Sequence, residues 1–158
     1  MIDTITGSKP QFLSSLDITS ASWQLGIAEE SRVYTSFTGL DGRRWKYKRC
    51  PMGLSNSPSH LVMLLSNLFS DKTRHHSCLC YMDDLVLFSR DWSSHIQQLE
   101  LSLQTLQDAN VSCNPRKTEI GFPEIDYLGY RISRDSVQSN PIQRDVTGAG
   151  NPLSPHLK

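Results

Sequence analysis

The stretch CLCYMDDLVLFS, from Cys78 to Ser89, places two adjacent carboxylates, Asp83 and Asp84, among nine apolar residues. At an effective dielectric constant of about 20, two carboxylates about 4 Å apart repel each other by roughly 4 kcal/mol. The apolar runs on either side are too short for helices, so they predict two strands joined at the aspartates. We therefore expect a β-hairpin whose tip faces a positively charged group or solvent.

The segments around this hairpin predict an alternation of strands and helices. A first strand is expected at 11–17 and a last one at 125–133, with the hairpin strands at 78–82 and 85–88. The order strand, helix, strand, strand, helix, strand is that of the ferredoxin-like split βαβ fold, which predicts an α+β protein with an antiparallel sheet and two helices on one face.

The two helices are predicted from caps and apolar spacing. Ser57 is the expected N-cap of the first helix and Pro58 its first residue, and the leucines that follow predict a largely buried helix. The second helix is expected over 93–109, with Asn110 as its C′ residue. Its predicted inner stripe is Ile96, Leu99, Leu103 and Leu106. Its predicted outer face is Gln97, Gln98, Glu100 and Gln104.

Connection rules place a third carboxylate at the hairpin tip. A right-handed crossover makes the first strand parallel to the strand that ends at Met82, with the strand from Leu85 antiparallel between them. Asp17, at the end of the first strand, then lies at the same sheet edge as Asp83 and Asp84. Clustered carboxylates are the ligands that Mg²⁺ or Mn²⁺ prefers, and two such ions could promote an in-line phosphoryl displacement. A solvent-exposed tip carrying two acids is the alternative.

A basic segment separates the first strand from the first helix. Residues 32–49 hold six basic residues and one acid, and Thr-Gly-Leu-Asp-Gly in the middle predicts a hairpin. Strand alternation places Arg44, Lys46 and Lys48 on one face and Trp45 and Tyr47 on the other. Such a face could contact a polyanion, or it could simply be solvated.

Composition sets the remaining limits. A chain of 158 residues favours one domain, and 16 basic against 16 acidic residues give no net charge, so any nucleic-acid binding depends on local asymmetry. The N-terminus has no signal-peptide pattern and no segment is long and apolar enough for a membrane, so we expect an intracellular, soluble protein without a membrane partner. Cys78 and Cys80 beside His75 and His76 match no common zinc spacing.

Four segments, in order, resemble the reverse transcriptases of gypsy-type LTR retrotransposons and of retroviruses. These segments are SLDITSASWQL (15–25), CPMGLSNSPS (50–59), YMDD (81–84) and NPRKTE with YLGYRIS (114–119 and 127–133). The resemblance covers about residues 11–141. It implies a polymerase palm with a basic fingers-type hairpin, and an RNA-directed DNA polymerase that transfers a nucleotide from a deoxynucleoside triphosphate to a primer 3′-hydroxyl with two Mg²⁺ or Mn²⁺ ions.

The resemblance also implies roles for individual residues. It makes Asp17, Asp83 and Asp84 the catalytic metal ligands, and the backbone of Ile18 a contact of the metal or the triphosphate. It makes Lys117 a proton donor to the leaving pyrophosphate. A solvated turn lysine is equally compatible with the sequence at that position. The implied nucleotide pocket is Ser22, Pro51, Met52, Gly53, Tyr81 and Met82. The implied nucleic-acid contacts are Arg44, Lys46, Lys48, Tyr127, Gly129 and Tyr130. Ser22 departs from the usual aromatic residue, which bears on selectivity for deoxynucleotides.

The family pattern predicts the domain organisation. Residues 1–10 are expected to be the end of a truncated fingers region, 11–140 a palm with partial fingers at 32–49, and 141–158 a disordered tail. The implied partners are template-primer, a deoxynucleoside triphosphate and the fingers, thumb and RNase H domains of a polyprotein, in a cytoplasmic retroelement particle. An inactive remnant or domesticated nucleic-acid-binding protein is the alternative, and a metal-dependent nuclease is a weaker one because it leaves CPMGLSNSP and YLGYRIS unexplained.

Overall fold

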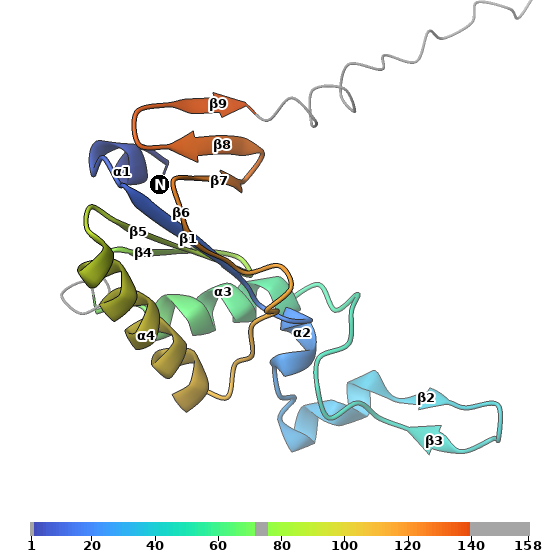
Figure 1. The fold of residues 1–158 in the computed structure, drawn as a ribbon. Helices are drawn as coiled ribbons and strands as arrows, with labels where there is room; N and C mark the ends of the chain where they lie inside the picture. The colour runs from blue at the N-terminus through green and yellow to red at the C-terminus, as the bar shows by residue number, and fades with distance from the viewer. Residues whose placement is uncertain (1, 72–75, 140–158) are drawn as a thin grey trace, which may run out of the picture.

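The computed structural model describes residues 2–71 and 76–139 and shows a mixed α+β protein built on a four-stranded sheet (Figure 1). The sheet order is β4-β5-β1-β6, and every pair of neighbours is antiparallel. These strands are β1 (Phe12–Asp17), β4 (Cys78–Tyr81), β5 (Asp84–Ser89) and β6 (Glu119–Phe122). Because β5 lies between β1 and β4, the predicted split βαβ arrangement of the first three strands is confirmed.

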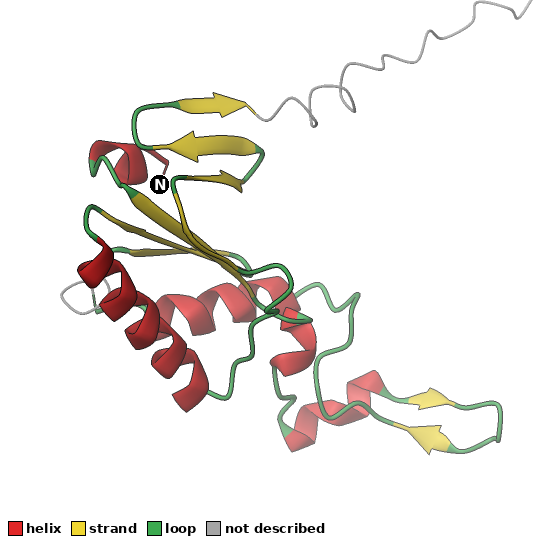
Figure 2. Cartoon of the chain, viewed as in Figure 1, coloured by secondary structure: helices red, strands yellow, loops and turns green. Residues whose placement is uncertain are grey.

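Two helices cover one face of this sheet, as predicted (Figure 2). These helices are α3 (Ser57–Leu68) and α4 (Trp92–Asp108). Leu61 and Leu65 of α3 and Leu99 and Leu106 of α4 join Leu16, Leu85 and Leu87 of the sheet in one buried cluster. Burying this many leucine side chains, each worth about 1.5–3 kcal/mol, makes this layer the main stabilising core.

The opposite face of the sheet carries a second layer, in which one prediction was wrong. It contains α1 (Ile2–Gly7) and a three-stranded sheet of β7 (Glu124–Tyr127), β8 (Tyr130–Ser133) and β9 (Val137–Ser139). Residues 125–133 are therefore a hairpin and not the last strand of the main sheet, which is β6. Leu128 and Gly129 have φ values of 50° and 79°, the pattern of a type I′ turn that joins two strands directly.

The details of the two helices differ from the sequence expectations. The N-cap of α3 is Asn56, so Ser57 lies inside the helix, and only one side of α3 is buried. At the end of α4, Asn110 has the left-handed φ of 53° expected of a C′ residue. The N–H of Val111 donates to the carbonyl of Leu106 at 2.8 Å and that of Asn110 to Gln107 at 2.9 Å, which is a Schellman motif.

The inner face of α4 is more polar than predicted. Its buried residues are His95, Gln98, Leu99, Ser102 and Leu106, whereas Ile96 and Leu103 are 37% and 42% exposed. The expected stripe is confirmed at Leu99 and Leu106 and was wrong at Ile96 and Leu103. Gln98 lies on the inner face and not on the outer one. The reason is a polar contact with the sheet, since Nε2 of the fully buried His95 lies 2.6 Å from Oγ of Ser14, which accepts from the Gly121 N–H at 3.0 Å.

His95 is expected to make the fold sensitive to acid. Burial lowers the pKa of its imidazole below the usual 6.5, so below that pH the unfolded chain binds a proton that the folded chain does not. The free energy of unfolding should therefore decrease as the pH falls below about 6.5, by at most about 1.4 kcal/mol per pH unit from this group. Urea unfolding at pH 7.5 and pH 5.5 measures the effect. The variant His95→Leu should lose this component, and an unchanged pH dependence in it would contradict the assignment.

An extended arm projects from the end of the sheet where β1 finishes (Figure 1). It follows the short helix α2 (Ala21–Gln24) and consists of a 3₁₀ helix (Glu29–Thr35), β2 (Phe37–Thr38) and β3 (Arg44–Trp45). The predicted hairpin at 32–49 is thus shorter than expected, because residues 32–35 are 3₁₀-helical and each strand has only two residues. Tyr47 packs against Phe37 and Trp23 with ring centroids 5.4 and 5.6 Å apart, so an aromatic cluster supports the arm.

The expected disordered tail from residue 141 lies outside the described residues. In the parts of the chain that the structure describes, no helix combines the length and apolar character needed to span a membrane.

Candidate active site

Three aspartates lie at one end of the main sheet, where β1 ends and β5 begins, and we call this end the acidic edge. Asp17 ends β1 and is the register partner of Asp84, which begins β5. The backbone N–H of Ile18 donates to the carbonyl of Asp83 at 3.0 Å. The expectation that Asp17 reaches the hairpin tip is therefore confirmed by strand register. By strand alternation Asp17 and Asp84 point to the face that carries α1 and the β7–β9 sheet, away from α3 and α4.

The pKa of Asp84 reflects its partly buried position beside two other carboxylates. The pKa of Asp84 is raised, first by partial burial and then by the neighbouring Asp83 and Asp17, and Lys117 opposes the shift. A raised carboxyl pKa means that the ionised form is destabilised by its surroundings. A cation placed between these carboxylates would offset the repulsion that Asp83 and Asp17 exert on Asp84, so this edge favours a positive charge.

Lys117 supplies one positive charge, and the loop 114–118 places it there. Its Nζ lies 3.2 Å from Oδ1 of Asp17, whose side chain is 22% exposed. Asn114 holds the loop, since its N–H donates to the Asp17 carbonyl at 2.8 Å and its own oxygens accept from the N–H groups of Arg116 and Lys117. Lys117 is therefore an ion-pair partner of Asp17 in this structure, and not a lysine surrounded only by solvent.

The donor set at this edge fits Mg²⁺ or Mn²⁺ by its chemistry, because carboxylate and carbonyl oxygens are the ligands those ions prefer. Within residues 2–71 and 76–139, however, no three His, Cys, Asp or Glu side chains converge closely enough to form a ready-made metal site. Lys117 already pairs with one oxygen of Asp17. Binding a divalent ion therefore requires side-chain rotations at this edge and a shift of the lysine.

The hairpin tip has an unusual backbone. Met82 has a φ of 53°, whereas Asp83 does not have a positive φ, so only the first central residue of the two-residue turn lies in the left-handed region. Glycine normally occupies that position, and a side chain there costs about 1–2 kcal/mol. Tyr81 and Met82 are 42% and 50% exposed, so their side chains lie at the surface beside the carboxylates. The backbone strain of this turn is therefore located at Met82.

Replacing Met82 with glycine is expected to stabilise the fold. Met82→Gly should raise the free energy of unfolding by about 1 kcal/mol, because glycine adopts a positive φ without strain. Chemical denaturation measures this change. Met52→Gly is the matched control, since Met52 is exposed and does not have a positive φ, and it should give no stabilisation. A lower stability for Met82→Gly than for the unchanged chain would contradict the assignment of strain.

Two of the segments expected to bind a nucleotide, α2 with Ser22 and the loop Pro51–Gly53, are tied to each other by adjacent backbone. The N–H of Cys50 donates to the carbonyl of Leu25 at 2.9 Å, and Gly26 forms a bridge with Arg49. Ser22 in α2 and the loop Pro51–Gly53 are therefore connected through adjacent backbone. Met52 is 75% exposed, and Gly53 has a φ of 95°, which favours glycine at that position.

The residues expected to contact nucleic acid divide into two groups. In the arm, Arg44, Lys46 and Lys48 are all exposed. In the β7–β8 hairpin, Tyr130 is exposed and Gly129 partly so, but Tyr127 is only 3% exposed. Burial and the neighbouring Asp84 raise the pKa of Tyr127 above its usual range. The expected direct contact of Tyr127 is therefore not compatible with its position, because it packs in the layer that supports the acidic edge.

Sequence reasoning missed two side-chain hydrogen-bonding features. One is the buried pair of Ser14 and His95, which lies between β1 and α4. The other is Gln24, whose side-chain amide bridges segments 88 residues apart. Neither has a local sequence signal, because each depends on a partner brought close only by the fold.

The fold matches solved viral enzymes. The foamy viral protease-reverse transcriptase in complex with double-stranded DNA superimposes with a TM-score of 0.81 over 90% of this chain and 24% of that chain, at 22% identity. The same viral protein in complex with an RNA/DNA hybrid gives a TM-score of 0.79 over 95% of this chain and 20% of that chain, at 21% identity. The architecture is thus that of a reverse transcriptase.

Sequence comparison gives the family. The model described as reverse transcriptase (RNA-dependent DNA polymerase) matches residues 3–132, and the chain belongs to this family, whose members are nucleotidyltransferases and typically use divalent metal ions. The chain is 32% identical over 84% of its length to the Pol polyprotein of the transposon gypsy from Drosophila melanogaster, and 31% identical over 84% to polyprotein P3 of Commelina yellow mottle virus. It spans 13% and 7% of those relatives.

Proposed function

We propose that this chain carries the catalytic centre of an RNA-directed DNA polymerase. In this proposal the main sheet with α3 and α4 is the palm, the arm at 32–49 is part of the fingers, and residues 1–10 are the end of the fingers region. The observation that supports it best is the pairing of Asp17 with Asp84 in strand register, beside which the carbonyl of Asp83 accepts from the N–H of Ile18. Because the chain belongs to the reverse transcriptase family, the proposal assigns these three aspartates as the catalytic acids.

Asp17, Asp83 and Asp84, with the backbone of Ile18, would hold two Mg²⁺ or Mn²⁺ ions. When bound, the ions supply charge stabilisation for in-line transfer of a nucleotide from a deoxynucleoside triphosphate to a primer 3′-hydroxyl, with loss of pyrophosphate. The chain's own contribution is to position groups and neutralise charge. Lys117, already 3.2 Å from Asp17, is within reach of the same edge and is the proposed proton donor to the leaving pyrophosphate.

The surrounding segments give the proposed substrate contacts. We assign the nucleotide to the surface formed by Ser22, Pro51, Met52, Gly53, Tyr81 and Met82. The template-primer is assigned to Arg44, Lys46 and Lys48 of the arm and to Gly129 and Tyr130 of the hairpin. A serine at position 22 leaves space beside the sugar, so the proposal includes weak discrimination against ribonucleotides. Further polyprotein domains and a cytoplasmic retroelement particle complete the proposed context.

A second candidate function is a nucleic-acid-binding remnant without turnover. The observation that favours it is the ion pair between Lys117 and Asp17, together with carboxylates that do not converge among the described residues. Under this alternative the arm would still bind a template, but divalent ions would not bind to the carboxylates of the acidic edge. The two functions therefore differ in their dependence on metal.

Primer extension separates the two functions. With an RNA template, a DNA primer and Mn²⁺, we expect the 158-residue chain to give weak extension, because positioning errors of about 1 Å cost roughly a hundredfold in rate. The extension should disappear in Asp83→Asn and persist in Asp126→Asn. Extension that survives Asp83→Asn would contradict the polymerase assignment, and complete absence of extension together with retained RNA binding would favour the remnant.

A further inference from the structure

We propose that Gln24 is a positioning residue that ties together three segments of the candidate active site. The first segment is 17–19, which begins at Asp17. The second is 112–117, which ends at Lys117, and the third is 49–53, which includes the proposed nucleotide loop. The inference rests on the proposed function for the importance of these segments. The hydrogen bonds that Gln24 makes to these segments can be tested separately from the proposed function.

Both ends of the Gln24 side-chain amide are engaged. Its Nε2 donates to the carbonyl of Thr19 at 2.5 Å and to the carbonyl of Ser112 at 2.9 Å. Its Oε1 accepts from the N–H of Ser112 at 2.7 Å. The side chain therefore pairs with Ser112 as a neighbouring β-strand would, by donating to its carbonyl and accepting from its N–H.

This pairing extends a short ladder that ends at the acidic edge. The N–H of Thr19 donates to the Ser112 carbonyl at 2.9 Å, and the N–H of Asn114 donates to the Asp17 carbonyl at 2.8 Å. Between them, Ile18 forms an antiparallel bridge with Cys113. Gln24 thus closes the end of the ladder at Thr19 and Ser112. Thr19 lies two residues after Asp17, and Ser112 lies two residues before the loop 114–118 that carries Lys117.

The backbone of the same residue holds the third segment. Its carbonyl accepts from Nη1 of Arg49 at 2.5 Å, and the carbonyl of the next residue, Leu25, accepts from the N–H of Cys50 at 2.9 Å. The end of α2 is therefore fixed to the residue that immediately precedes Pro51. A side-chain change at Gln24 keeps these backbone bonds, but it removes the amide that joins this anchored end of α2 to the segments at Thr19 and Ser112.

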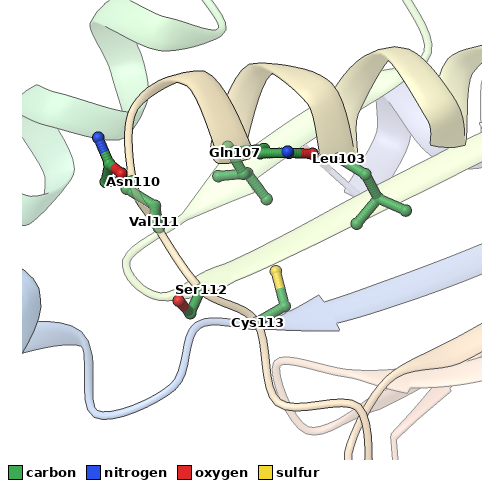
Figure 3. A pocket seen from close by; sticks show the side chains of 7 residues that line it. Leu103, Gln107, Asn110, Val111, Ser112 and Cys113 are labelled. Atoms are coloured by element: carbon green, nitrogen blue, oxygen red, sulfur yellow. The ribbon is translucent and has the colours of Figure 1, made fainter.

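The hydrogen bonds of Gln24 lie on the exposed side of this junction, whereas Ile18 and Val111 belong to the buried core and Leu25 packs against it. Two cavities of about 300 and 360 Å³ adjoin it, and both Asn110 and Ser112 line each of them. Figure 3 shows the first cavity, where the chain leaves α4 and passes beside the end of β1. Exposed backbone hydrogen bonds open locally at lower cost than buried ones, so loss of the Gln24 amide should loosen the exposed side of this ladder without disturbing the core.

Amide hydrogen exchange on the 158-residue chain tests the tie. In Gln24→Met, which keeps the side-chain length but removes the amide, exchange of the Thr19, Ser112 and Asn114 amides should accelerate by about tenfold or more. Exchange of Val86 and Phe88 in β5 should not change. The apparent Kd for Mn²⁺, measured by calorimetry, should increase by about tenfold, an effect that a merely structural residue would not produce.

Gln104→Met is the matched control, because Nε2 of Gln104 donates only within α4, to Asp108 at 2.7 Å. It should leave both measurements unchanged. If Gln24→Met does not fold, Gln24→Glu, which keeps the acceptor for Ser112, should accelerate exchange at Thr19 and Asn114 while Ser112 stays protected. Acceleration at Ser112 alone, or an unchanged Kd for Mn²⁺, would overturn the positioning role. If the unchanged chain bound no Mn²⁺, the proposed function would fail, and exchange at Thr19 and Asn114 would still decide the tie.

Discussion

Asp17→Asn is expected to weaken Mn²⁺ binding by at least about a hundredfold. The substitution keeps the shape of the side chain but removes the charge that faces Asp84 across the strand pair. Loss of a residue that only orients a metal ligand typically costs about 10–100-fold in affinity, so loss of a charged ligand should cost at least as much. Isothermal titration calorimetry with MnCl₂ on the 158-residue chain measures this directly.

Asp126→Asn provides the matched control for this change. Asp126 also pairs with a cation, since its oxygens accept from Nε and Nη2 of Arg131 at 2.9 and 3.1 Å. It lies on β7, in the separate three-stranded sheet, and not at the tip that holds Asp83 and Asp84. Its replacement should leave the Mn²⁺ affinity unchanged. Equal losses in the two variants would show that general negative charge attracts the ion, which would contradict a site at Asp17.

Removing three positive charges from the arm is expected to weaken the binding of nucleic acid strongly. The triple variant Arg44→Gln, Lys46→Gln and Lys48→Gln should bind an RNA/DNA hybrid roughly 100-fold more weakly at low salt. Each lost phosphate contact also reduces the slope of log K against log salt concentration by about 0.9, so the slope should decrease by about 2 to 3. Fluorescence anisotropy over a range of KCl concentrations gives both quantities.

A triple variant with the same loss of charge elsewhere controls for net charge. Lys9, Arg90 and Arg134 lie outside the arm, and their replacement by glutamine should change the affinity far less. If both triple variants lose affinity and slope equally, binding depends on overall charge, and the arm has no specific role. An unchanged slope in the arm variant would likewise contradict phosphate contacts at these residues.

The order and direction of the first three strands and the acidic edge could be predicted from the sequence, because chain connectivity determines them. Two short apolar runs around Asp83 and Asp84 require a hairpin, and the handedness of crossover connections then brings Asp17 to the same edge. The left-handed φ of Met82 was also foreseeable, since a two-residue turn without glycine or asparagine is strained. These features depend on local pattern and on rules that hold for all such folds.

Features that depend on tertiary partners were not predictable in the same way. The inner face of α4 turns toward His95 and Gln98 because Ser14 of β1 offers a polar partner, which overrides the leucine pattern. The hairpin at 125–133 was expected to be one strand, because Leu128 with Gly129 is an uncommon pair for a type I′ turn. The tie through Gln24 requires Ser112 to arrive from the far end of α4.

Anomalous diffraction from crystals soaked in MnCl₂ tests the central claim most directly. The claim is that Asp17, Asp83 and Asp84 jointly bind divalent ions at the edge where β1 meets the hairpin tip. We predict anomalous peaks between the carboxylates of Asp17 and Asp84, with Nζ of Lys117 moved away from its present position 3.2 Å from Asp17. Manganese found only at other acidic residues, with the Lys117–Asp17 pair intact, would contradict the claim.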